Sequence, residues 1–344
     1  MRIPRSPLAS RAASAGRSIA AVLPWLGLAL LTGCNESTMS TFEGHSDLTK
    51  SILDIYGTIT WIDTALFILV QGVLIVAVIK FRATGKETEL PEQVHGNLPM
   101  EIGWTIAPVL ILMMIAIPTV SLIFDSQAQA KDGALIVNAT GKQWWFQFGF
   151  PQYNFETANE LHIPLGRQVD IRLQSDNVIH AFWAPQIAAK RDMIPGRVNH
   201  ITFTADKIGE YLGQCAEYCQ DSHALMKFRI EVESSEDFEK WAKAQATPQA
   251  DTVDDSEGYK AFQGATCVAC HAIDGTNAQG HIGPSLTHVG SRKRFAASVL
   301  EMNEANLKLW LKDPSAVKPG CKMPNLKLTD EQINTIVPFL QSLK

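Results

Sequence analysis

The central domain of this 344-residue chain is defined by the stretch Cys215-Ala-Glu-Tyr-Cys219-Gln-Asp-Ser-His223-Ala-Leu-Met226. A further histidine, His180, precedes it in the sequence Val-Ile-His-Ala-Phe-Trp. Two thiols, two imidazoles and a thioether are soft or borderline ligands, and this set selects copper rather than magnesium or calcium. A mononuclear blue-copper site needs only one of the cysteines. The second cysteine therefore predicts a dinuclear centre in which both sulfurs bridge both copper ions.

Two alternatives to copper are a zinc site and a disulfide between Cys215 and Cys219. A zinc site would use two cysteines and two histidines, but it leaves Met226 without a role, and zinc cysteines usually have the closer CxxC spacing. A methionine by itself is weak support, because methionine more often fills a core. Its weight here comes from the two cysteines and two histidines that accompany it.

The residues around this stretch, from about 133 to 232, form short runs rich in alternating or β-branched residues, punctuated by Gly, Pro and Asn. Residues 134–139, 168–173 and 199–204 are examples. They predict an antiparallel β-sandwich or barrel outside the membrane, over about residues 131–232.

Two long apolar stretches precede this domain, at about residues 55–81 and 102–124. Each exceeds the roughly 20 residues that a membrane-spanning helix requires, so residues 34–130 are expected to form a transmembrane hairpin. The loop between them contains Lys80, Arg82 and Lys86, which the positive-inside rule places in the cytoplasm. Asp63 and Gln71 would be costly in lipid and should face partner helices or a polar path.

The N-terminus has the layout of an export signal, with arginines ahead of an apolar run at residues 19–31 that is too short to span. We expect residues 1–33 to be a signal peptide for export across a bacterial inner membrane. Leu31-Thr-Gly-Cys34 resembles a lipoprotein box, in which Cys34 would be lipidated and become the new N-terminus. The alternative is an uncleaved start with a chance cysteine.

A second redox motif, Cys267-Val-Ala-Cys270-His271, lies near the C-terminus. In a CxxCH signature the two thiols attach covalently to haem c, and the histidine becomes an axial iron ligand. The second axial ligand is expected to be Met323, because a histidine and methionine pair raises the haem potential into the range of an electron carrier. The competing candidates are Met302, His281 and His288.

The segment around this motif changes from strand-like to helical periodicity. Residues 233–257 read as a short helix running into a linker, and residues 305–312 and 331–340 have helical spacing. Residues 258–344 are therefore expected to form a small all-α domain. Cys321, two residues before Met323, has no assigned partner or function.

The Cys-x-Glu-x-Cys-x-x-x-His-x-x-Met pattern with His180 upstream resembles the CuA motif of cytochrome c oxidase subunit II. The match extends from the first span to about residue 232 and includes residues 141–146, 177–183 and 190–199. It implies a two-helix transmembrane hairpin followed by a cupredoxin-like Greek-key β-sandwich. Residues 258–344 resemble a class I cytochrome c, and the fusion resembles the caa3-type oxidases.

The resemblance implies a role for each matched residue. Cys215 and Cys219 would bridge the two coppers, with His180 and Met226 completing one ion. His223 and the backbone carbonyl of Glu217 would complete the other, and the Glu217 side chain would face a magnesium ion shared with the catalytic subunit.

Two further positions follow from the same resemblance. Trp144, as an exposed aromatic near copper, would be where electrons enter, although Trp145 and Phe146 stand where the family more often has Tyr then Trp. Glu101 matches the acidic residue at the mouth of a proton path; alternatively it is a carboxylate at headgroup level.

Both ligand sets are closed, so the chain should move electrons rather than transform a substrate. The resemblance implies partnership with oxidase subunits I and III, with electrons passing from a cytochrome c or an upstream complex through haem c and copper to haem a. Oxygen would be reduced to water and protons pumped. A copper-bearing subunit of a nitric oxide reductase is the alternative. The net charge of −5 and the lack of a basic tract argue against nucleic-acid binding.

The two extramembrane domains differ in charge. Residues 256–344 hold ten Lys/Arg against seven Asp/Glu, whereas residues 131–245 hold twelve against fifteen. Opposite signs should favour docking of the haem domain on the copper domain.

Overall fold

The computed structural model describes residues 39–82, 93, 95–249 and 253–344. The expected signal peptide and Cys34 lie outside the described residues, as does Lys86 of the loop between the two apolar stretches.

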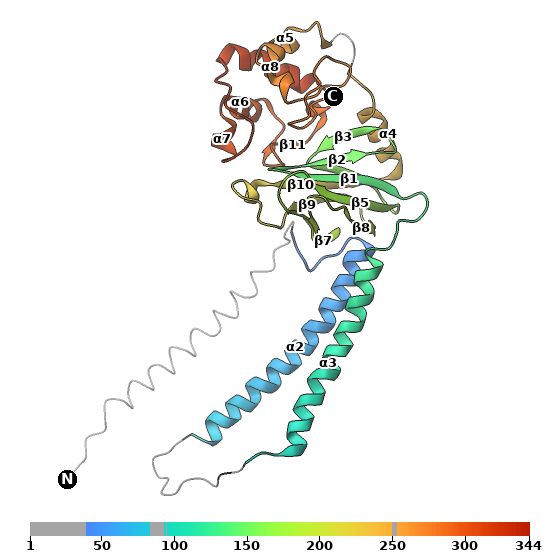
Figure 1. Ribbon diagram of the computed structural model, residues 1–344, viewed down its shortest axis with the longest axis vertical. Coiled ribbons are helices and arrows are strands. Elements are labelled where there is room, and N and C mark those ends of the chain that lie inside the picture. Colours follow the sequence, from blue (N-terminus) through green and yellow to red (C-terminus); the bar gives the residue numbers. More distant parts are fainter. Residues whose placement is uncertain (1–38, 83–92, 94, 250–252) are drawn as a thin grey trace, which may run out of the picture. The chain divides into compact units, whose positions relative to one another are not determined.

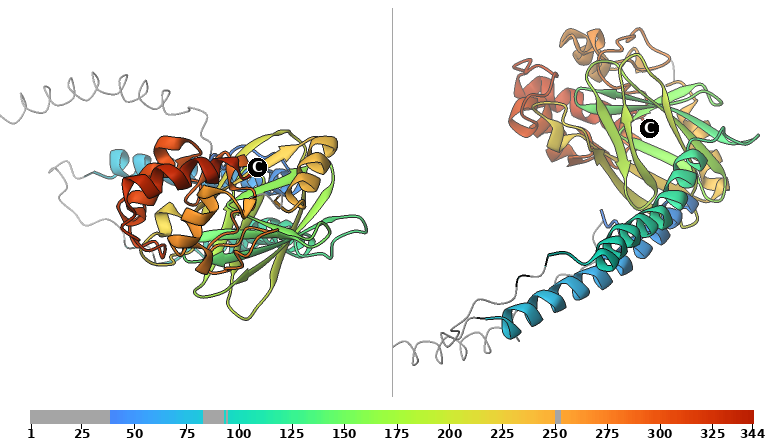
Figure 2. Two further views of the ribbon diagram at one scale, coloured as in Figure 1. Left: turned by 90° about the horizontal axis from the view of Figure 1, so that it is seen from above. Right: turned by 60° about the horizontal axis from the view of Figure 1, so that its bottom comes forward.

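Two long apolar helices come first, α2 (Asp47–Lys80) and α3 (Leu98–Asp125), and they run side by side (Figures 1 and 2). Both are long and apolar enough to cross a membrane, and no residue in the most apolar 18-residue window of either is buried. Ser46 caps α2 by accepting from the backbone N–H of Thr49, and Asn97 caps α3 in the same way. Apolar side chains left uncovered along both helices require lipid or partner helices.

A β-sandwich follows, built from two five-stranded sheets (Figure 1). The first has the order β3-β2-β1-β5-β8 and the second β4-β10-β9-β6-β7. The strands are β1 (Leu135–Lys142), β2 (Trp145–Phe150), β3 (Phe155–Ala158), β4 (Glu160–Pro164), β5 (Gln168–Ser175), β6 (His180–Ala184), β7 (Ala188–Met193), β8 (Asn199–Thr204), β9 (Gly209–Cys215) and β10 (Lys227–Glu233).

The sheets are mixed rather than purely antiparallel. β1 pairs in parallel with β5, and β4 pairs in parallel with β10, while the other named pairs are antiparallel. Parallel partners cannot be joined by a tight hairpin. Alternating apolar and polar residues show which face of a strand is buried. They do not show whether a partner strand distant in the chain runs parallel or antiparallel, so the sequence could not reveal these two pairs.

The core between the sheets is aromatic. Phe146 and Phe148 alternate along β2 and meet Phe182 of β6 and Phe228 of β10, all fully buried. The rings of Phe182 and Phe228 stack with centroids 4.5 Å apart. Burying each phenylalanine contributes roughly 1.5–3 kcal/mol, so the strands that carry the candidate ligands rest on a rigid support.

The C-terminal region is helical, as expected. Helix α4 (Ser235–Gln245) packs on the sandwich, and the later helices are α5 (Glu257–Gly264), α6 (Glu304–Lys312), α7 (Pro314–Val317) and α8 (Asp330–Ser342). Helices α5 and α8 cross closely at Gly258, where a Cβ would lie 2.3 Å from Cβ of Phe339. Only glycine fits there without displacing a helix.

Candidate copper and haem sites

The candidate copper ligands come from three neighbouring segments. His180 opens β6 and Cys215 closes β9. The loop after β9 carries Cys219, His223 and Met226, which directly precedes β10. Sγ of Cys215 lies 3.8 Å from Nδ1 of His180, and Sγ of Cys219 lies 3.5 Å from Nδ1 of His223 and 3.9 Å from Sδ of Met226. The carbonyl oxygen of Glu217 is 3.2 Å from Sγ of Cys215. All six predicted donor groups are therefore linked by short contacts, and the ligand atoms of His180, Cys215 and Cys219 lie within 4.8 Å of one another.

The two sulfurs are separated by 3.8 Å, and both cysteines are free and buried. A disulfide would require about 2.05 Å. The structure therefore places two thiols, not a disulfide, at this position, and their separation leaves room for metal ions between them.

The orientation of the His180 ring is set by its contacts with residues that are not candidate ligands. Nε2 of His180 lies 2.9 Å from Oδ1 of Asn177, which turns Nδ1 toward Cys215. The ring also packs on Gly141, where a Cβ would approach within 2.8 Å of the imidazole. Gly141 therefore keeps open the space that His180 occupies.

The two thiols titrate as a pair. A hydrogen bond with Cys219 lowers the pKa of Cys215 to about 3, with His180 adding to the effect. The same hydrogen bond, together with burial, raises the pKa of Cys219. One thiolate forms readily, which suits a site that holds cations through sulfur.

Trp144 lies against the copper loop but is not an exposed aromatic, since only 6% of its surface is accessible. Its indole N–H donates to the carbonyl of Cys219 at 2.8 Å, and the Gln143 amide donates to the same oxygen at 3.1 Å. Its backbone carbonyl accepts from Lys318 of the helical domain. The prediction of an exposed Trp144 is therefore wrong, because the residue is buried where the helical domain contacts it through Lys318.

Two acidic residues occupy distinct positions. The side chain of Glu217 is exposed beside the copper loop. Glu101 lies in the first turn of α3, where its carboxylate accepts from the backbone N–H of Asn97 at 3.0 Å. That contact satisfies an unpaired donor at the helix start, so Glu101 has a capping role besides any role in a proton path.

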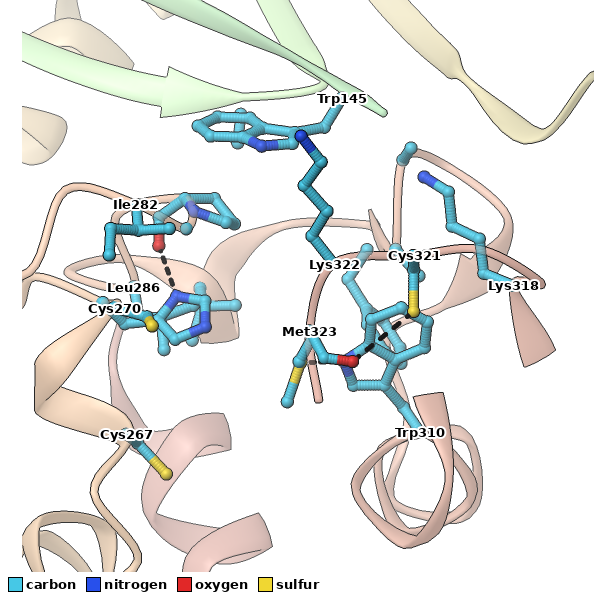
Figure 3. Close-up of a pocket in the computed structure, with 18 of the residues that line it drawn as sticks. Trp145, Cys267, Cys270, Ile282, Leu286, Trp310, Lys318, Cys321, Lys322 and Met323 are labelled. Atoms are coloured by element: carbon cyan, nitrogen blue, oxygen red, sulfur yellow. Dashed lines mark hydrogen bonds between the residues drawn. The ribbon is translucent and has the colours of Figure 1, made fainter. Parts of the chain in front are cut away.

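The candidate haem site is a cavity of about 470 Å³ (Figure 3). Cys267, Cys270 and His271 line it together with Met323, and Trp145 of the sandwich closes one side. Apolar residues form most of the remaining wall, including Leu286, Val289, Leu307, Trp310, Ile336 and Leu340. A large, flat, mostly apolar group attached through two thiols fits such a cavity.

His271 is oriented as an axial ligand would be. Its Nδ1 lies 2.8 Å from the carbonyl oxygen of Pro284, and Gly283 packs on the ring so closely that a Cβ would come within 2.5 Å. Nε2 is therefore left for iron, and burial lowers the pKa of His271, which favours the neutral imidazole that binds metal.

Among the candidates for the second ligand, Met323 lines the cavity, and its Sδ accepts from the Trp310 indole at 3.2 Å. His281 also lines the cavity. His288 instead lies with Nε2 2.9 Å from the carbonyl oxygen of Thr247, and Met302 packs against the helical core. The arrangement therefore favours Met323 over Met302 and His288.

Arg292 is a cavity residue that sequence reasoning missed. It is buried, donates to the carbonyl of Ser285 at 2.6 Å, and its Nε has no hydrogen-bond partner among the described residues. Haem carries carboxylates, so an orphaned buried guanidinium fits that group. Arg292 lies in the basic run Arg292-Lys-Arg294, which matches no motif for haem binding and so did not reveal it.

Residues of opposite charge lie across the contact between the two extramembrane domains. Nζ of Lys293 lies 2.9 Å from a carboxylate oxygen of Glu231 and 3.7 Å from Glu210. Glu160 of β4 accepts from the backbone N–H of Arg294 at 2.9 Å.

Together, an apolar helix pair, a β-sandwich with a cluster of cysteine, histidine and methionine ligands, and a helical domain with a CxxCH cavity define a membrane-anchored electron-transfer protein. The family models match in the same order: cytochrome c oxidase subunit II, transmembrane domain, at residues 36–122, its periplasmic domain at residues 154–233, and cytochrome c at residues 256–344.

Full-length relatives agree with these matches. The chain is 31% identical to cytochrome c oxidase subunit 2 of Alkalihalophilus pseudofirmus, covering 91% of this chain and 94% of the relative. It is also 31% identical to that of Bacillus subtilis, covering 92% and 94%. The solved periplasmic domain of subunit II of cytochrome oxidase from Bradyrhizobium japonicum is 32% identical, with a TM-score of 0.33, covering 34% of this chain and 96% of that one.

The chain therefore belongs to the cytochrome c oxidase subunit II family, with a cytochrome c domain at its C-terminus. It is a subunit of the oxidase complex and serves electron transfer in a haem-copper oxidase. Its family implies a copper centre and haem c, and the residues described above fit both groups.

Proposed function

We propose that the chain accepts electrons at its cytochrome domain from a cytochrome c or an upstream cytochrome complex and passes them to a dinuclear copper centre. It then delivers them to haem a of oxidase subunit I, where oxygen is reduced to water and protons are pumped. Subunit III completes the complex. The observation that carries the proposal is the convergence of six donor groups about two free thiols whose sulfurs lie 3.8 Å apart.

In this proposal, Cys215 and Cys219 would hold two copper ions through their sulfurs. His180 and Met226 would complete one ligand set, and His223 with the Glu217 carbonyl would complete the other. The bound ions would supply one-electron chemistry with little change in geometry. Asn177 and Gly141 hold His180 in place, which limits the reorganisation of the ligand shell between oxidation states.

The cytochrome domain would hold haem c by thioether bonds to Cys267 and Cys270, with His271 and Met323 as axial ligands. Pro284 fixes the His271 ring through its carbonyl, and Trp310 fixes Met323 through its indole N–H. Arg292 would neutralise a haem carboxylate in this cavity.

Other roles complete the proposal. Trp144 would take part in electron transfer to copper, the exposed Glu217 carboxylate would reach a magnesium ion shared with subunit I, and Glu101 would stand at the mouth of a proton path. The hairpin would occupy residues 34–130 in a bacterial inner membrane, with the domains at 131–232 and 258–344 on the periplasmic side, joined by 233–257. Residues 1–33 would be removed and Cys34 lipidated.

The test is an anaerobic optical and EPR titration of the purified complex, followed by oxygen uptake with reduced cytochrome c. We expect a c-type haem spectrum, a mixed-valence dicopper signal and oxygen consumption. Consumption of nitric oxide but not oxygen would assign the subunit to a reductase instead. Absence of the dicopper signal would refute the copper assignment.

A further inference from the structure

One loop of the cytochrome domain, residues 318–323, touches the copper-ligand loop at one end and carries the proposed haem ligand at the other. Lys318 follows α7, and Met323 lies five residues later, with Cys321 between them (Figure 3). The backbone N–H of Cys321 donates to the carbonyl of Lys318 at 3.1 Å, which makes the loop compact. A displacement of Lys318 would therefore be passed on to Met323.

The first contact is made by a buried amine. Lys318 is only 4% exposed, and its Nζ donates to the backbone carbonyl of Trp144. The indole of the same Trp144 donates to the carbonyl of Cys219 at 2.8 Å. Two hydrogen bonds thus connect the side chain of Lys318 to a proposed copper ligand.

The second contact involves the next two residues. The carbonyl of Pro319 accepts from the hydroxyl of Ser222, which lies between the proposed ligands Cys219 and His223. Gly320 has φ +78°, and a Cβ there would lie 2.4 Å from Cβ of Asp221. A glycine is required both by the backbone conformation and by the close approach.

A lysine is an expensive residue for this position. Taking an amine out of water carries a large penalty, and burial lowers the pKa of Lys318 to about 7. An apolar side chain would fill the same space without that penalty. The amine, however, donates to the backbone carbonyl of the buried Trp144, and a buried acceptor that loses its donor is costly.

We propose that Lys318, Pro319 and Gly320 form a docking clasp that holds the haem domain on the copper-ligand loop, and that Lys318 is a positioning residue for electron transfer from haem to copper. This inference rests on the proposed function, because the clasp matters only if electrons pass between haem c and copper. It would set the distance between these two centres and the hydrogen bonds that connect them. The clasp keeps the fused haem domain at the copper-ligand loop. A separate, diffusing electron donor would instead have to reach the same site by collision.

The test compares Lys318→Met with unmodified protein in the purified oxidase complex. Methionine keeps the length of the side chain but cannot donate to Trp144. After flash photoreduction of haem c, we expect reduction of copper to slow by about tenfold, the factor expected when one buried hydrogen bond is lost from a docked state. The c-type haem spectrum and the dicopper EPR signal should be unchanged. Hydrogen exchange of the backbone amides of residues 219–223 should speed up, including in protein without metals.

Lys312→Met is the matched control, since Lys312 is an exposed lysine of the same domain that pairs with Asp330. It should leave both the transfer rate and the exchange unchanged. Ser222→Ala, which removes only the hydroxyl donor to Pro319, should slow transfer by a smaller factor and tests the clasp if Lys318→Met does not assemble. The clasp would be overturned if Ser222→Ala or Lys318→Met kept the native rate of electron transfer and the native hydrogen exchange of residues 219–223. This result counts only if the c-type haem spectrum and the dicopper EPR signal are both intact. Missing haem or dicopper signals in the unmodified complex would instead refute the proposed function.

Discussion

The copper and haem sites differ in how the protein prepares them. At the copper site the chain itself supplies closely spaced donors, with each sulfur within 4 Å of other ligand atoms. At the haem site the protein supplies a cavity of about 470 Å³ with two thiols and two axial candidates on its wall. The first site is specified by ligand chemistry, and the second by shape.

This difference predicts different responses to mutation. Replacing one of the proposed bridging cysteines should abolish the copper site, because the proposed ions are held by a small set of donor groups and each donor is needed. The haem site should tolerate the loss of one ligand, because covalent attachment and the apolar wall remain. The two domains should also fail independently, since each has its own buried core.

The largest effect is expected from Cys219→Ser. It removes one of the two proposed bridging sulfurs, and we expect complete loss of the dicopper EPR signal with an unchanged c-type haem spectrum. Cys321→Ser is the control, because Cys321 lies outside the copper cluster, and it should retain the signal. A dicopper signal in Cys219→Ser would show that the bridging assignment is wrong.

Met323→Ala should affect only the haem. Covalent haem should remain on Cys267 and Cys270, while the reduction potential falls on the order of 0.1 V and the spectral features of methionine ligation disappear. Redox titration of the haem band measures the shift. Met302→Ala should leave both features in place; a shift in that variant instead would transfer the ligand role to Met302.

Gly258→Ala tests the helix crossing that shapes the haem cavity. Its Cβ would meet Phe339 at 2.3 Å, so we expect the cytochrome domain to lose about 1–3 kcal/mol by overpacking, without change in the copper domain. Denaturant unfolding followed by haem absorbance measures this. Gly264→Ala, in the same helix with nothing within 4 Å of the new Cβ, should be neutral or slightly stabilising. Equal losses in both variants would rule out the packing explanation.

The smallest effect is expected from Glu160→Gln at the contact between the domains. Burial raises the pKa of Glu160 above its usual 4.5. Protonated Glu160 therefore makes the folded state relatively more stable. This contribution to the free energy of unfolding is fully present below the pKa of Glu160 in the unfolded chain, and it is lost as pH rises through the pKa of Glu160 in the folded chain. Glutamine retains an acceptor for the N–H of Arg294 without the charge. We expect a Tm higher by about 1–3 °C at neutral pH, with the difference vanishing near pH 4.5.

Calorimetry of the full chain at both pH values checks this prediction. Glu236→Gln, at an exposed carboxylate on α4, is the control and should change little at either pH. A gain in Tm that persisted unchanged at low pH would mean that charge burial at Glu160 is not its cause.

Much of the architecture was predictable because it depends on local pattern. The two apolar helices follow from runs of apolar residues, the sandwich from alternating strands, and helices α6 and α8 from helical spacing. The parallel pairs of β1 with β5 and β4 with β10 were not predictable, because they join strands that are distant in the chain. Both candidate sites were predicted from motifs whose residue types have a specific metal chemistry.

Sequence alone predicted the ligand set proposed for this protein, since thiols, imidazoles and a thioether at these spacings leave few chemical alternatives. Only the tertiary structure showed that Trp144 is buried and that Lys318 reaches the copper domain. It also showed that Arg292 lines the candidate haem cavity, with an Nε that has no partner in the part of the chain that the structure describes. These three features arise where segments far apart in the chain meet. Desolvation and hydrogen bonding at these contacts depend on which segments pack together in the folded molecule. The type and spacing of residues within one segment do not reveal that packing.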